Sequence, residues 1–517
     1  MLPRFGVVVL ASSLLVSCVP APTAVPAAPA QPIEQRSANQ RFQIALTGMP
    51  AAPSPESAAS GVPLWFALFD PLTGLDQKLN VVPWAAEKWT QVDPLTWRFS
   101  VRKGLVFGNG DPLTAEDVAF TANLVLETRT PLIVHLGNLT SVTQVDEYSV
   151  DFVTKIPDAS VLPAVSALWI MPKKYYTQVG KNGFAVKPVG SGPYELADFK
   201  SGDMAVVRKK ATRHAFRNPN PTELTFRSIT EGTTMVAGYK TGELDVLVGQ
   251  ISPDQIELLA RTDAVIMSRL SSVATVLFSQ QENIDRQTPL TDKRVRLALN
   301  YAVDKESIAK TIFRGYAKPT GQLSVPDSPS WDDSVQPIPY DPAMARRLLA
   351  EAGYPNGFKL PIGLEFTPLT GNPLMAQAIQ SYLRDVGVEI SVTQYELGVF
   401  LDKFYGRNGQ SKGDLFVTGV GDTNGFGTTI YGYYTCNKPL VWWCNPDFNK
   451  NMEASVGEPD IQKRGALMRR AIATLRSDVG LLFLVVAPTF IVQGPKIKGF
   501  VWESTNLNNF DSIYRVE

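Results

Sequence analysis

Two adjacent segments of contrasting periodicity decide the fold class: residues 93–104, DPLTWRFSVRKG, and residues 111–118, DPLTAEDV. In the first segment, apolar and polar side chains alternate from Trp97 to Arg102, and this spacing predicts a half-buried β-strand. In the second, Thr114 is followed three residues later by Asp117 and then by apolar residues at helical spacing, which predicts a capped amphipathic helix. A strand followed directly by such a helix indicates a layered α/β protein.

The same alternation of strands and helices continues toward the C-terminus. The apolar stripes of amphipathic helices are expected within residues 295–302, 345–352, 375–386 and 468–475. Further strands are expected at residues 148–152, 388–392 and 481–486. We therefore predict an α/β fold with mixed sheets, rather than a helix bundle or a β-sandwich.

The composition fits a globular protein and excludes several functional classes. The chain has 517 residues, of which 44% are hydrophobic and 19% charged, and this length suggests about two to four domains. Its 49 basic and 49 acidic residues balance, so no basic surplus points to nucleic acid as a partner.

With two histidines, three cysteines and none of the common nucleotide, zinc-protease, serine-hydrolase or thioredoxin motifs, we expect no metal site and no cofactor. Paired catalytic carboxylates stay open, because they follow no fixed spacing.

The N-terminus has the pattern of an export signal. Arg4 precedes an apolar run of about twelve residues, which as a helix would rise about 18 Å and is too short to span a hydrocarbon core of about 30 Å. The run ends in Leu15-Val16-Ser17-Cys18, which resembles the bacterial lipobox, in which the cysteine receives a lipid. We expect a signal peptide at residues 1–17 and a tether at residues 18–35, anchored through Cys18 to the extracytoplasmic side of a membrane. The alternative is an ordinary signal peptide with a spare cysteine.

Six blocks of the chain occur in the order found in one protein family. The longest covers residues 93–118, and the others are Trp84–Trp89, Pro188–Tyr194, Gly242–Val246, Asp292–Asp304 and Gly353–Phe358. In this combination they resemble the family 5 extracellular solute-binding proteins, the peptide and nickel receptors of ABC importers. Two positions depart from the family pattern. Asp478-Val479-Gly480 replaces an acidic-x-Pro element, and Gly425 stands where an aspartate-containing loop usually carries a proline.

The resemblance implies a two-lobed, periplasmic-binding-protein-like fold of type II, in the large peptide-binding subclass, that closes about a hinge. Residues 36–272 would form lobe I, with a subdomain at about 70–180, and residues 273–482 would form lobe II. Residues 483–517 would return to lobe I. The implied function is that of a monomeric binding lipoprotein, which captures oligopeptides or similar small solutes and delivers them to ABC permease subunits. Most of the matching blocks would then be scaffold rather than ligand contacts.

The glycine-rich segment 419–427 is the strongest candidate for ligand binding. Its four glycines allow the backbone to approach a ligand closely. In peptide-binding relatives, an aspartate in the equivalent loop accepts the ligand's α-ammonium through a charge-assisted hydrogen bond, and Asp422 is the residue that matches. The other candidate ligand contacts in this loop are Gly421, Thr423, Asn424 and Phe426. The alternative is an Asx turn, in which Asp422 binds its own backbone.

Trp442 is a further candidate for lining the ligand site, because it follows a predicted loop. Packing of Trp442 or its neighbour Trp443 in the core is an equal alternative.

Cys436 and Cys444 are expected to form a disulfide. They lie eight residues apart in a chain that carries an export signal, and Cys18 is consumed by the lipid. A bridge across so short a loop would contribute roughly 2–3 kcal/mol of stability in the chain-entropy account. Two free thiols are the alternative.

Two functional classes remain open at this point: a receptor, and a secreted hydrolase that acts through paired carboxylates on a similar scaffold. The only side chains with a neutral-pH pKa suited to general-base chemistry are His135 and His214, and a receptor needs no such base. We therefore predict a binding protein without catalytic residues.

Overall fold

The computed structural model gives the fold of the chain from residue 36 onward. The residues that it describes are 36–56, 62–128, 136, 138–249, 251–367, 373–396, 399, 413–419, 427–436, 441–502 and 509–517. The expected signal peptide, the tether and Cys18 lie outside the described residues.

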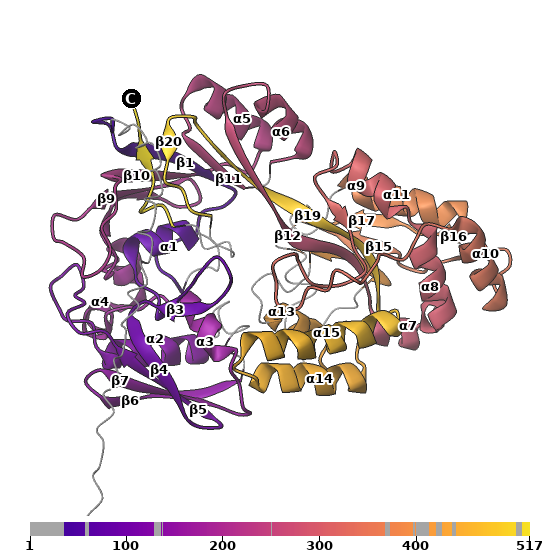
Figure 1. The fold of residues 1–517 in the computed structure, drawn as a ribbon, viewed down its shortest axis with the longest axis horizontal. Helices are drawn as coiled ribbons and strands as arrows, with labels where there is room; N and C mark the ends of the chain where they lie inside the picture. The colour runs from indigo at the N-terminus through magenta and orange to yellow at the C-terminus, as the bar shows by residue number, and fades with distance from the viewer. Residues whose placement is uncertain are drawn as a thin grey trace, which may run out of the picture.

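Two long antiparallel strands connect the two halves of the molecule (Figure 1). β12 (Val265–Phe278) and β19 (Leu481–Gln493) pair with each other from one half to the other. They form the centre of an 11-stranded sheet with the order β17-β15-β18-β12-β19-β11-β1-β10-β9-β8, and β13 pairs with β19 beside this path. We call the half built from residues before β12 and after β19 the first lobe, and the half built from the residues between them the second lobe.

The first lobe contains one side of the large sheet and a smaller antiparallel sheet. Its part of the large sheet consists of β1 (Arg41–Leu46), β8 (Tyr194–Lys200), β9 (Met204–Lys209), β10 (Glu223–Ser228) and β11 (Val246–Gly249). The smaller sheet has the order β4-β5-β7-β6 and consists of β4 (Ala86–Asp93), β5 (Thr96–Val101), β6 (Leu139–Asp146) and β7 (Ser149–Thr154). The helices are α1 (Val62–Leu68), α2 (Ala115–Thr128), α3 (Val161–Ala164), α4 (Lys173–Val186), α5 (Gly232–Thr241) and α6 (Pro253–Leu259). Two short strand pairs complete this lobe: β2 (Thr73–Leu75) with β3 (Val81–Pro83), and β20 (Ile497–Lys498) with β21 (Tyr514–Arg515).

The segment that decides the fold class forms the expected strand and helix. β5 buries Trp97, Phe99 and Val101 on one face. α2 follows it, and at its start the backbone N–H of Thr114 donates to Oδ2 of Asp117 at 2.9 Å. The apolar stripe of α2 lies against β6 and β7 in one hydrophobic cluster. The prediction of a mixed α/β fold is confirmed.

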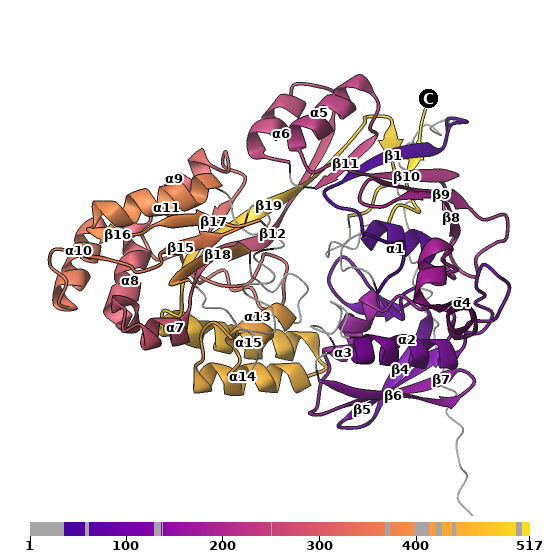
Figure 2. The ribbon, with the colours of Figure 1, turned by 180° about the vertical axis from the view of Figure 1, so that it is seen from behind.

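The second lobe surrounds the other end of the β12–β19 pair. Its strands in the large sheet are β13 (Lys318–Pro319), β15 (Leu364–Phe366), β17 (Val392–Gln394) and β18 (Leu415–Gly419), and a separate pair joins β14 (Phe358–Lys359) to β16 (Val388–Glu389). The helices are α7 (Gln280–Asp285), α8 (Lys293–Ala302), α9 (Lys305–Thr311), α10 (Pro342–Glu351), α11 (Pro373–Asp385), α13 (Thr428–Tyr434), α14 (Pro446–Gly457) and α15 (Ile461–Ser477). Seen from either side, α14 and α15 extend toward α3 of the first lobe (Figures 1 and 2). A single apolar core joins residues of β12, β18, β19, α8, α11 and α15.

A buried cluster of charged and polar side chains holds distant segments of the first lobe together. The carboxylate of Asp70 is fully buried and accepts hydrogen bonds from Trp84 Nε1 at 2.9 Å and Arg217 Nη1 at 3.3 Å. His214 Nε2 lies 2.9 Å from the other oxygen of Asp70. Arg217 also pairs with Asp511, at 2.7 and 3.1 Å, and so ties the C-terminal segment to this cluster.

Replacing Asp70 by Asn should destabilise the protein in a pH-dependent way. Burial alone would raise the pKa of the Asp70 carboxyl, but the hydrogen bond with His214 and the charge of Arg217 outweigh it and hold this pKa well below its ordinary range. Breaking a buried ion pair typically costs about 3–5 kcal/mol, so we expect Asp70→Asn to lower the free energy of unfolding by about that amount at pH 7. Because a lowered pKa stabilises the folded state only above the unfolded-state pKa of about 4, the difference from wild type should shrink as the pH falls below it.

The measurement is urea unfolding, followed by tryptophan fluorescence, at pH 7 and at pH 3. Asp254→Asn is the matched control, because Asp254 pairs with Arg314 at the exposed surface and its loss should leave the midpoint almost unchanged. An equal loss of stability for Asp70→Asn at both pH values would contradict the assignment of a stabilising carboxylate.

Candidate functional site

The strands of the two lobes point toward each other. β19 is antiparallel to both β11 and β12, so β11 runs in the same direction as β12, toward the second lobe. β1 is parallel to β11, and β10 is parallel to β1, so these two strands run toward the second lobe as well. β18 runs opposite to β12, and β15 and β17 are parallel to β18, so these three strands run toward the first lobe. In open α/β sheets, ligands bind outside the carboxyl ends of the strands. Here the carboxyl ends of both sets face the same region between the lobes.

The pairing registers locate this region along β12. Gly249, the last residue of β11, and Ser268 of β12 both lie opposite Phe490 of β19. Gly419, the last residue of β18, lies opposite Ala274 of β12. The ends of β11 and β18 are thus separated by the six steps from residue 268 to residue 274, a distance of about 20 Å at the rise of a β-strand. We call residues 268–274 of β12, with residues 485–490 of β19 that pair with them, the crossing segment.

The crossing segment is less regular and less buried than the rest of the strand pair. In β19, the residues of Ala487–Thr489 are only partly buried, whereas the residues on both sides are buried. The pairing with β12 shifts register between Leu270 and Ser272, within the segment, and again between Ala274 and Thr275, at its end in the second lobe. Pro488 has no N–H to donate to the ladder. Irregular pairing and reduced packing make this the part of the sheet that bends most easily.

Both ends of the candidate ligand loop are fixed tightly. At Gly419, a side chain could not be added without displacement, because a Cβ atom would lie 2.6 Å from Oγ of Ser272 in the crossing segment. Gly427 has a φ of +63°, which favours glycine, and a Cβ there would lie 2.6 Å from the methyl groups of Met452 in α14 and Met468 in α15. The loop therefore begins at the crossing segment and ends over the α14–α15 pair.

The residues predicted to contact a ligand fall mostly within this loop. Gly421, Asp422, Thr423, Asn424 and Phe426 lie outside the described residues, and their role stays a prediction. Gly425, the departure from the family pattern, lies there as well.

Trp442 lies within the described part of the chain and is buried. Its ring stacks on Phe416 of β18, with the ring centroids 5.3 Å apart and the planes inclined by 18°. Its backbone N–H donates to the carbonyl oxygen of Tyr433 at 2.7 Å. Trp442 thus packs against the strand that leads into the candidate loop, and a direct contact with a ligand stays a prediction.

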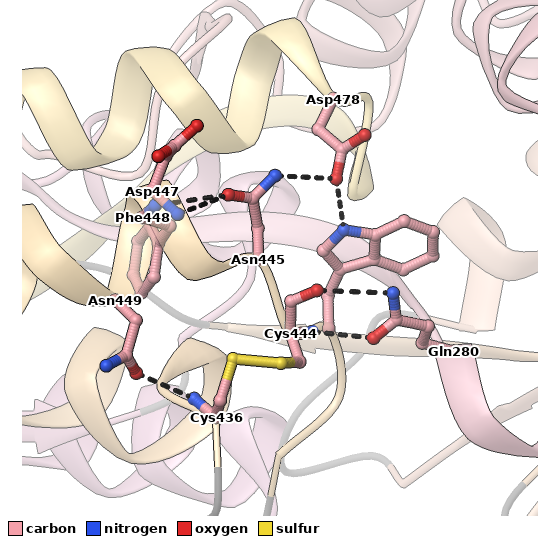
Figure 3. The surroundings of a disulfide bond; sticks show 9 residues. Gln280, Cys436, Cys444, Asn445, Asp447, Phe448, Asn449 and Asp478 are labelled. Atoms are coloured by element: carbon pink, nitrogen blue, oxygen red, sulfur yellow. Dashed lines mark hydrogen bonds between the residues drawn. A yellow bond between two sulfur atoms is a disulfide. The ribbon is translucent and has the colours of Figure 1, made fainter.

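The expected disulfide is present and joins the segment after α13 to the segment before α14 (Figure 3). Cys444 exchanges two hydrogen bonds with the side chain of Gln280 in α7: its N–H donates to Oε1 at 2.7 Å, and its carbonyl accepts from Nε2 at 3.2 Å. The N–H of Cys436 donates to Oδ1 of Asn449 in α14 at 3.0 Å. The bridge between Cys436 and Cys444 therefore fixes the chain that follows the candidate loop to two helices.

The departure at Asp478-Val479-Gly480 has a structural explanation. Oδ2 of Asp478 accepts hydrogen bonds from Trp443 Nε1 at 2.7 Å and from Asn445 Nδ2 at 3.2 Å (Figure 3). Asn445 in turn caps α14, accepting the backbone N–H of Asp447 at 2.9 Å. A Cβ at Gly480 would lie 2.8 Å from the ring of Trp443, so the turn and the tryptophan fit each other only with glycine at this position.

Sequence reasoning missed a buried polar pair at the carboxyl edge of the second-lobe strands. Glu365 of β15 is fully buried, and its Oε1 accepts a hydrogen bond from the hydroxyl of Tyr395 at 2.9 Å. Tyr395 directly follows β17. The available signal was a carboxylate between the apolar residues Leu364 and Phe366, which is unusual in a buried strand.

The described histidine, His214, does not support the hydrolase alternative. His214 Nδ1 accepts the backbone N–H groups of Phe216 and Arg217, at 3.3 and 3.1 Å, so its Nε2 carries the proton and donates to Asp70. The ring is thereby occupied on both sides by structural hydrogen bonds. His135 lies outside the described residues.

Within the described ranges, no cluster of three or more histidine, cysteine, aspartate or glutamate side chains is placed to hold a metal ion. None of the helices in this part of the chain has the length and apolar character needed to cross a membrane.

Comparison with known proteins identifies the family. Residues 80–440 match the bacterial extracellular solute-binding proteins, family 5 (middle region). The chain therefore belongs to the family 5 extracellular solute-binding proteins, which are binding proteins rather than enzymes.

Individual relatives cover most of the chain. It is 28% identical over 455 residues to the glutathione-binding protein GsiB of Salmonella typhimurium (strain LT2), covering 84% of this chain and 86% of that protein. It is 25% identical over 486 residues to the dipeptide-binding protein of Escherichia coli (strain K12), covering 88% and 89%. Among solved structures, it resembles the ABC transporter-associated periplasmic binding protein DppA from Helicobacter pylori in complex with the peptide STSA, with a TM-score of 0.78, 21% identity and coverage of 93% and 99%. The oligopeptide-binding protein AppA from Bacillus subtilis, in complex with a nonapeptide, gives a TM-score of 0.76 at 20% identity and coverage of 94% and 100%. The predicted binding-protein fold is confirmed.

Proposed function

We propose that the protein is the substrate-binding component of an ABC importer, which holds a peptide or a similar small polar solute between its two lobes. The observation that carries this proposal is the convergence of the strand ends of both lobes on the crossing segment, in a member of a solute-binding family. The relatives bind glutathione, dipeptides and longer peptides. These ligands share a free α-ammonium group and carboxylate groups. The bound solute would be delivered to permease subunits in the membrane.

In this proposal Asp422 receives the α-ammonium of the ligand. The loop that carries it starts at the crossing segment, beside the carboxyl ends of β15 and β18. Thr423, Asn424, Gly421 and Phe426 would complete the contacts, with Trp442 supporting the strand from behind. A carboxylate excluded from water forms a strong charge-assisted hydrogen bond with an ammonium group.

Asp422→Asn should weaken ligand binding while barely changing thermal stability. Removing one partner of a buried charge pair costs about 2–5 kcal/mol, which corresponds to roughly 30-fold to several thousand-fold in dissociation constant. Calorimetric titration with glutathione and a panel of dipeptides measures the affinity, and differential scanning fluorimetry measures Tm. The N-acetylated form of the bound peptide should show the same loss with the wild-type protein and little further loss with the variant, because both changes delete one interaction.

The opposite pattern, a lower Tm with unchanged affinity, would mean that Asp422 forms an Asx turn. If none of these peptides binds to the wild-type protein, the peptide class of ligand is wrong.

We further propose that the two lobes, residues 36–272 with 483–517 and residues 273–482, open and close about the crossing segment. Partial burial in that segment and the two register shifts, one within it and one at its end, support this proposal. The lobes also touch on the side opposite the crossing. There, the backbone N–H of Ala159 donates to the carbonyl oxygen of Val456, near the end of α14, at 2.8 Å. We call this contact the clasp, and we infer that it forms on closure.

The first-lobe side of the clasp is held in place by its own hydrogen bonds. Oδ1 of Asp158 accepts the backbone N–H and the hydroxyl of Ser160, at 2.8 and 2.5 Å, and Oδ2 accepts Asn138 Nδ2 at 2.8 Å. The carbonyl of Asp158 accepts Trp97 Nε1 at 2.9 Å. These hydrogen bonds hold the N–H of Ala159 in position before closure. Closure would therefore cost little entropy, because few further residues of the first lobe would have to become ordered.

Gly457→Val should shift the lobes toward the open state and weaken binding without touching the ligand. A Cβ at Gly457 would lie 3.3 Å from the carbonyl oxygen of Pro157, and the larger valine side chain would push the lobes apart at the clasp. Overpacking of this kind costs about 1–3 kcal/mol, so we expect affinity to fall about 5- to 150-fold. Small-angle X-ray scattering in the presence of ligand should report a larger radius of gyration than for wild type.

Ala454→Val is the control, because Ala454 lies on the same helix and is exposed, so that a larger side chain there can point into solvent. Unchanged affinity and unchanged dimensions for Gly457→Val would show that the clasp plays no part in closure.

We also propose that Cys18 carries the lipid that holds the protein at the membrane surface. The tetrad Leu15-Val16-Ser17-Cys18 supports this assignment, and the tether after it, which is rich in proline and alanine, would leave the lobes free to reach a permease. Cys18→Ala should move the protein from the membrane fraction to the soluble fraction on cell fractionation, with the unfolding midpoint of the purified protein unchanged. Retention of the variant in the membrane fraction would contradict lipid anchoring through Cys18.

A further inference from the structure

The second lobe contains a cavity that is separate from the region between the lobes. It has a volume of about 440 Å³ and lies between α8, the C-terminal half of α15 and the segment 321–338. The end of α15 lies beside α7 and α8 in both views of the fold (Figures 1 and 2). None of these lining elements carries a residue of the candidate ligand loop or of the crossing segment. The volume lies within the range of small-molecule binding sites, about 300–1,000 Å³.

The lining of this cavity has an excess of positive charge. Lys293, Arg469 and Arg476 reach it, against the single carboxylate of Asp332. Asp332 accepts hydrogen bonds from the backbone N–H and the hydroxyl of Ser334, at 2.9 and 2.6 Å. Among the described residues, none of the three cations forms an ion pair with a carboxylate. Asp332 interacts with Arg469 and balances only one of the three cations, so a net positive charge remains that a solute anion in the site would offset.

Backbone carbonyl groups hold the two arginine side chains in place. Arg476 Nη1 donates to the carbonyl oxygen of Gly321 at 3.1 Å, and Arg469 Nη1 donates to the carbonyl oxygen of Pro329. A guanidinium group has five N–H donors, so each arginine keeps further donors that no described residue accepts. Partial burial of Arg476 also lowers its pKa from the ordinary value, which is the expected effect of removing a cation from water without a partner.

The rest of the lining is apolar, and this restricts the kind of anion that fits. The aliphatic side chains of the cavity are Leu297, Val335, Ile338, Ile472 and Val479. Of these, Ile338, Ile472 and Val479 are buried. An inorganic anion would satisfy the arginines but leave this apolar surface without a partner. A carboxylate attached to an apolar body would satisfy both, because a guanidinium group pairs with a carboxylate through two parallel hydrogen bonds.

We infer that this cavity is a second binding site, which takes a small organic carboxylate with an apolar body. Arg469 and Arg476 bind the carboxylate group, Lys293 adds positive charge at the entrance, and the aliphatic side chains contact the apolar body. The site does not depend on the function proposed for the region between the lobes.

The experiment is calorimetric titration of the full mature chain with 3-phenylpropanoate as the probe. We expect binding to the wild-type protein and a loss of at least about tenfold in affinity for the double variant Arg469→Gln/Arg476→Gln, because each hydrogen bond to a charged group contributes substantially. The neutral amide, 3-phenylpropanamide, should not bind measurably, and sulfate should bind more weakly than the carboxylate.

Arg470→Gln is the matched control, because Arg470 lies on α15 between the two arginines but is exposed and does not line the cavity. It should leave the affinity unchanged.

Several outcomes would overturn the inference. These are the absence of binding to the wild-type protein, equal affinity for the double variant, equal affinity for the amide, and sulfate binding as tight as that of the carboxylate. Circular dichroism checks that the double variant is folded. If it is not, Lys293→Gln decides the question, because Lys293 is exposed and its loss should weaken binding by about two- to fivefold. Unchanged affinity in that variant would also overturn the inference.

Discussion

The structure depends on the pairing of β12 with β19. This antiparallel pair is shared by both lobes, and every other strand of the large sheet is placed relative to it, on one side or the other. Each strand contributes an almost entirely apolar run to the second-lobe core, where six consecutive residues of β19, from Leu481 to Val486, are buried. Toward the region between the lobes the pairing becomes irregular: the register shifts between Ala274 and Thr275, still within this buried run, and again between Leu270 and Ser272.

The shared pair also sets the polarity of the functional region. Because β11 and β18 flank the pair and have opposite directions relative to β12, each lobe presents the carboxyl ends of its strands at the crossing segment. Loops that leave the strands at these ends, including the candidate ligand loop, therefore gather in one place although they are far apart in the chain. No single residue creates this arrangement. It follows from the order in which the strands join the sheet.

Parts of this architecture could be predicted from the sequence, and the successes and failures have physical causes. The strand at residues 96–101 and the capped helix after Thr114 were predicted closely, because local periodicity and capping follow from the sequence within a few residues. The last long strand was predicted only for residues 481–486, whereas β19 continues to Gln493. The apolar run ends near Pro488, which lies in the crossing segment, and the strand continues past it because the ladder there is irregular and tolerates a residue without an N–H.

The candidate site shows the same division. The disulfide followed from the export signal and the even number of remaining cysteines, and the structure contains it. The role of Asp478, which anchors Trp443 and Asn445, could not be predicted, because these partners meet only after α14 and α15 have packed together. The pair of Glu365 and Tyr395 was missed for a similar reason, since parallel strands bring them together across thirty residues of sequence. Contacts between distant segments leave little trace in local periodicity.

A hinged binding protein must combine rigid and deformable parts, and the chain separates them clearly. Rigid elements surround the candidate loop: the disulfide, the Gln280 contacts of Cys444, the stacking of Trp442 on Phe416, and the close contacts at Gly419 and Gly427. In the proposed closure, the deformable element is the crossing segment, around the partly buried residues Ala487–Thr489. If bending were spread over the lobes, each opening would disturb the apolar cores and the buried Asp70 cluster, at a large cost in free energy. Bending confined to a short irregular stretch would let the lobes move as units, so that binding energy would be used for closure and not for reordering the binding site.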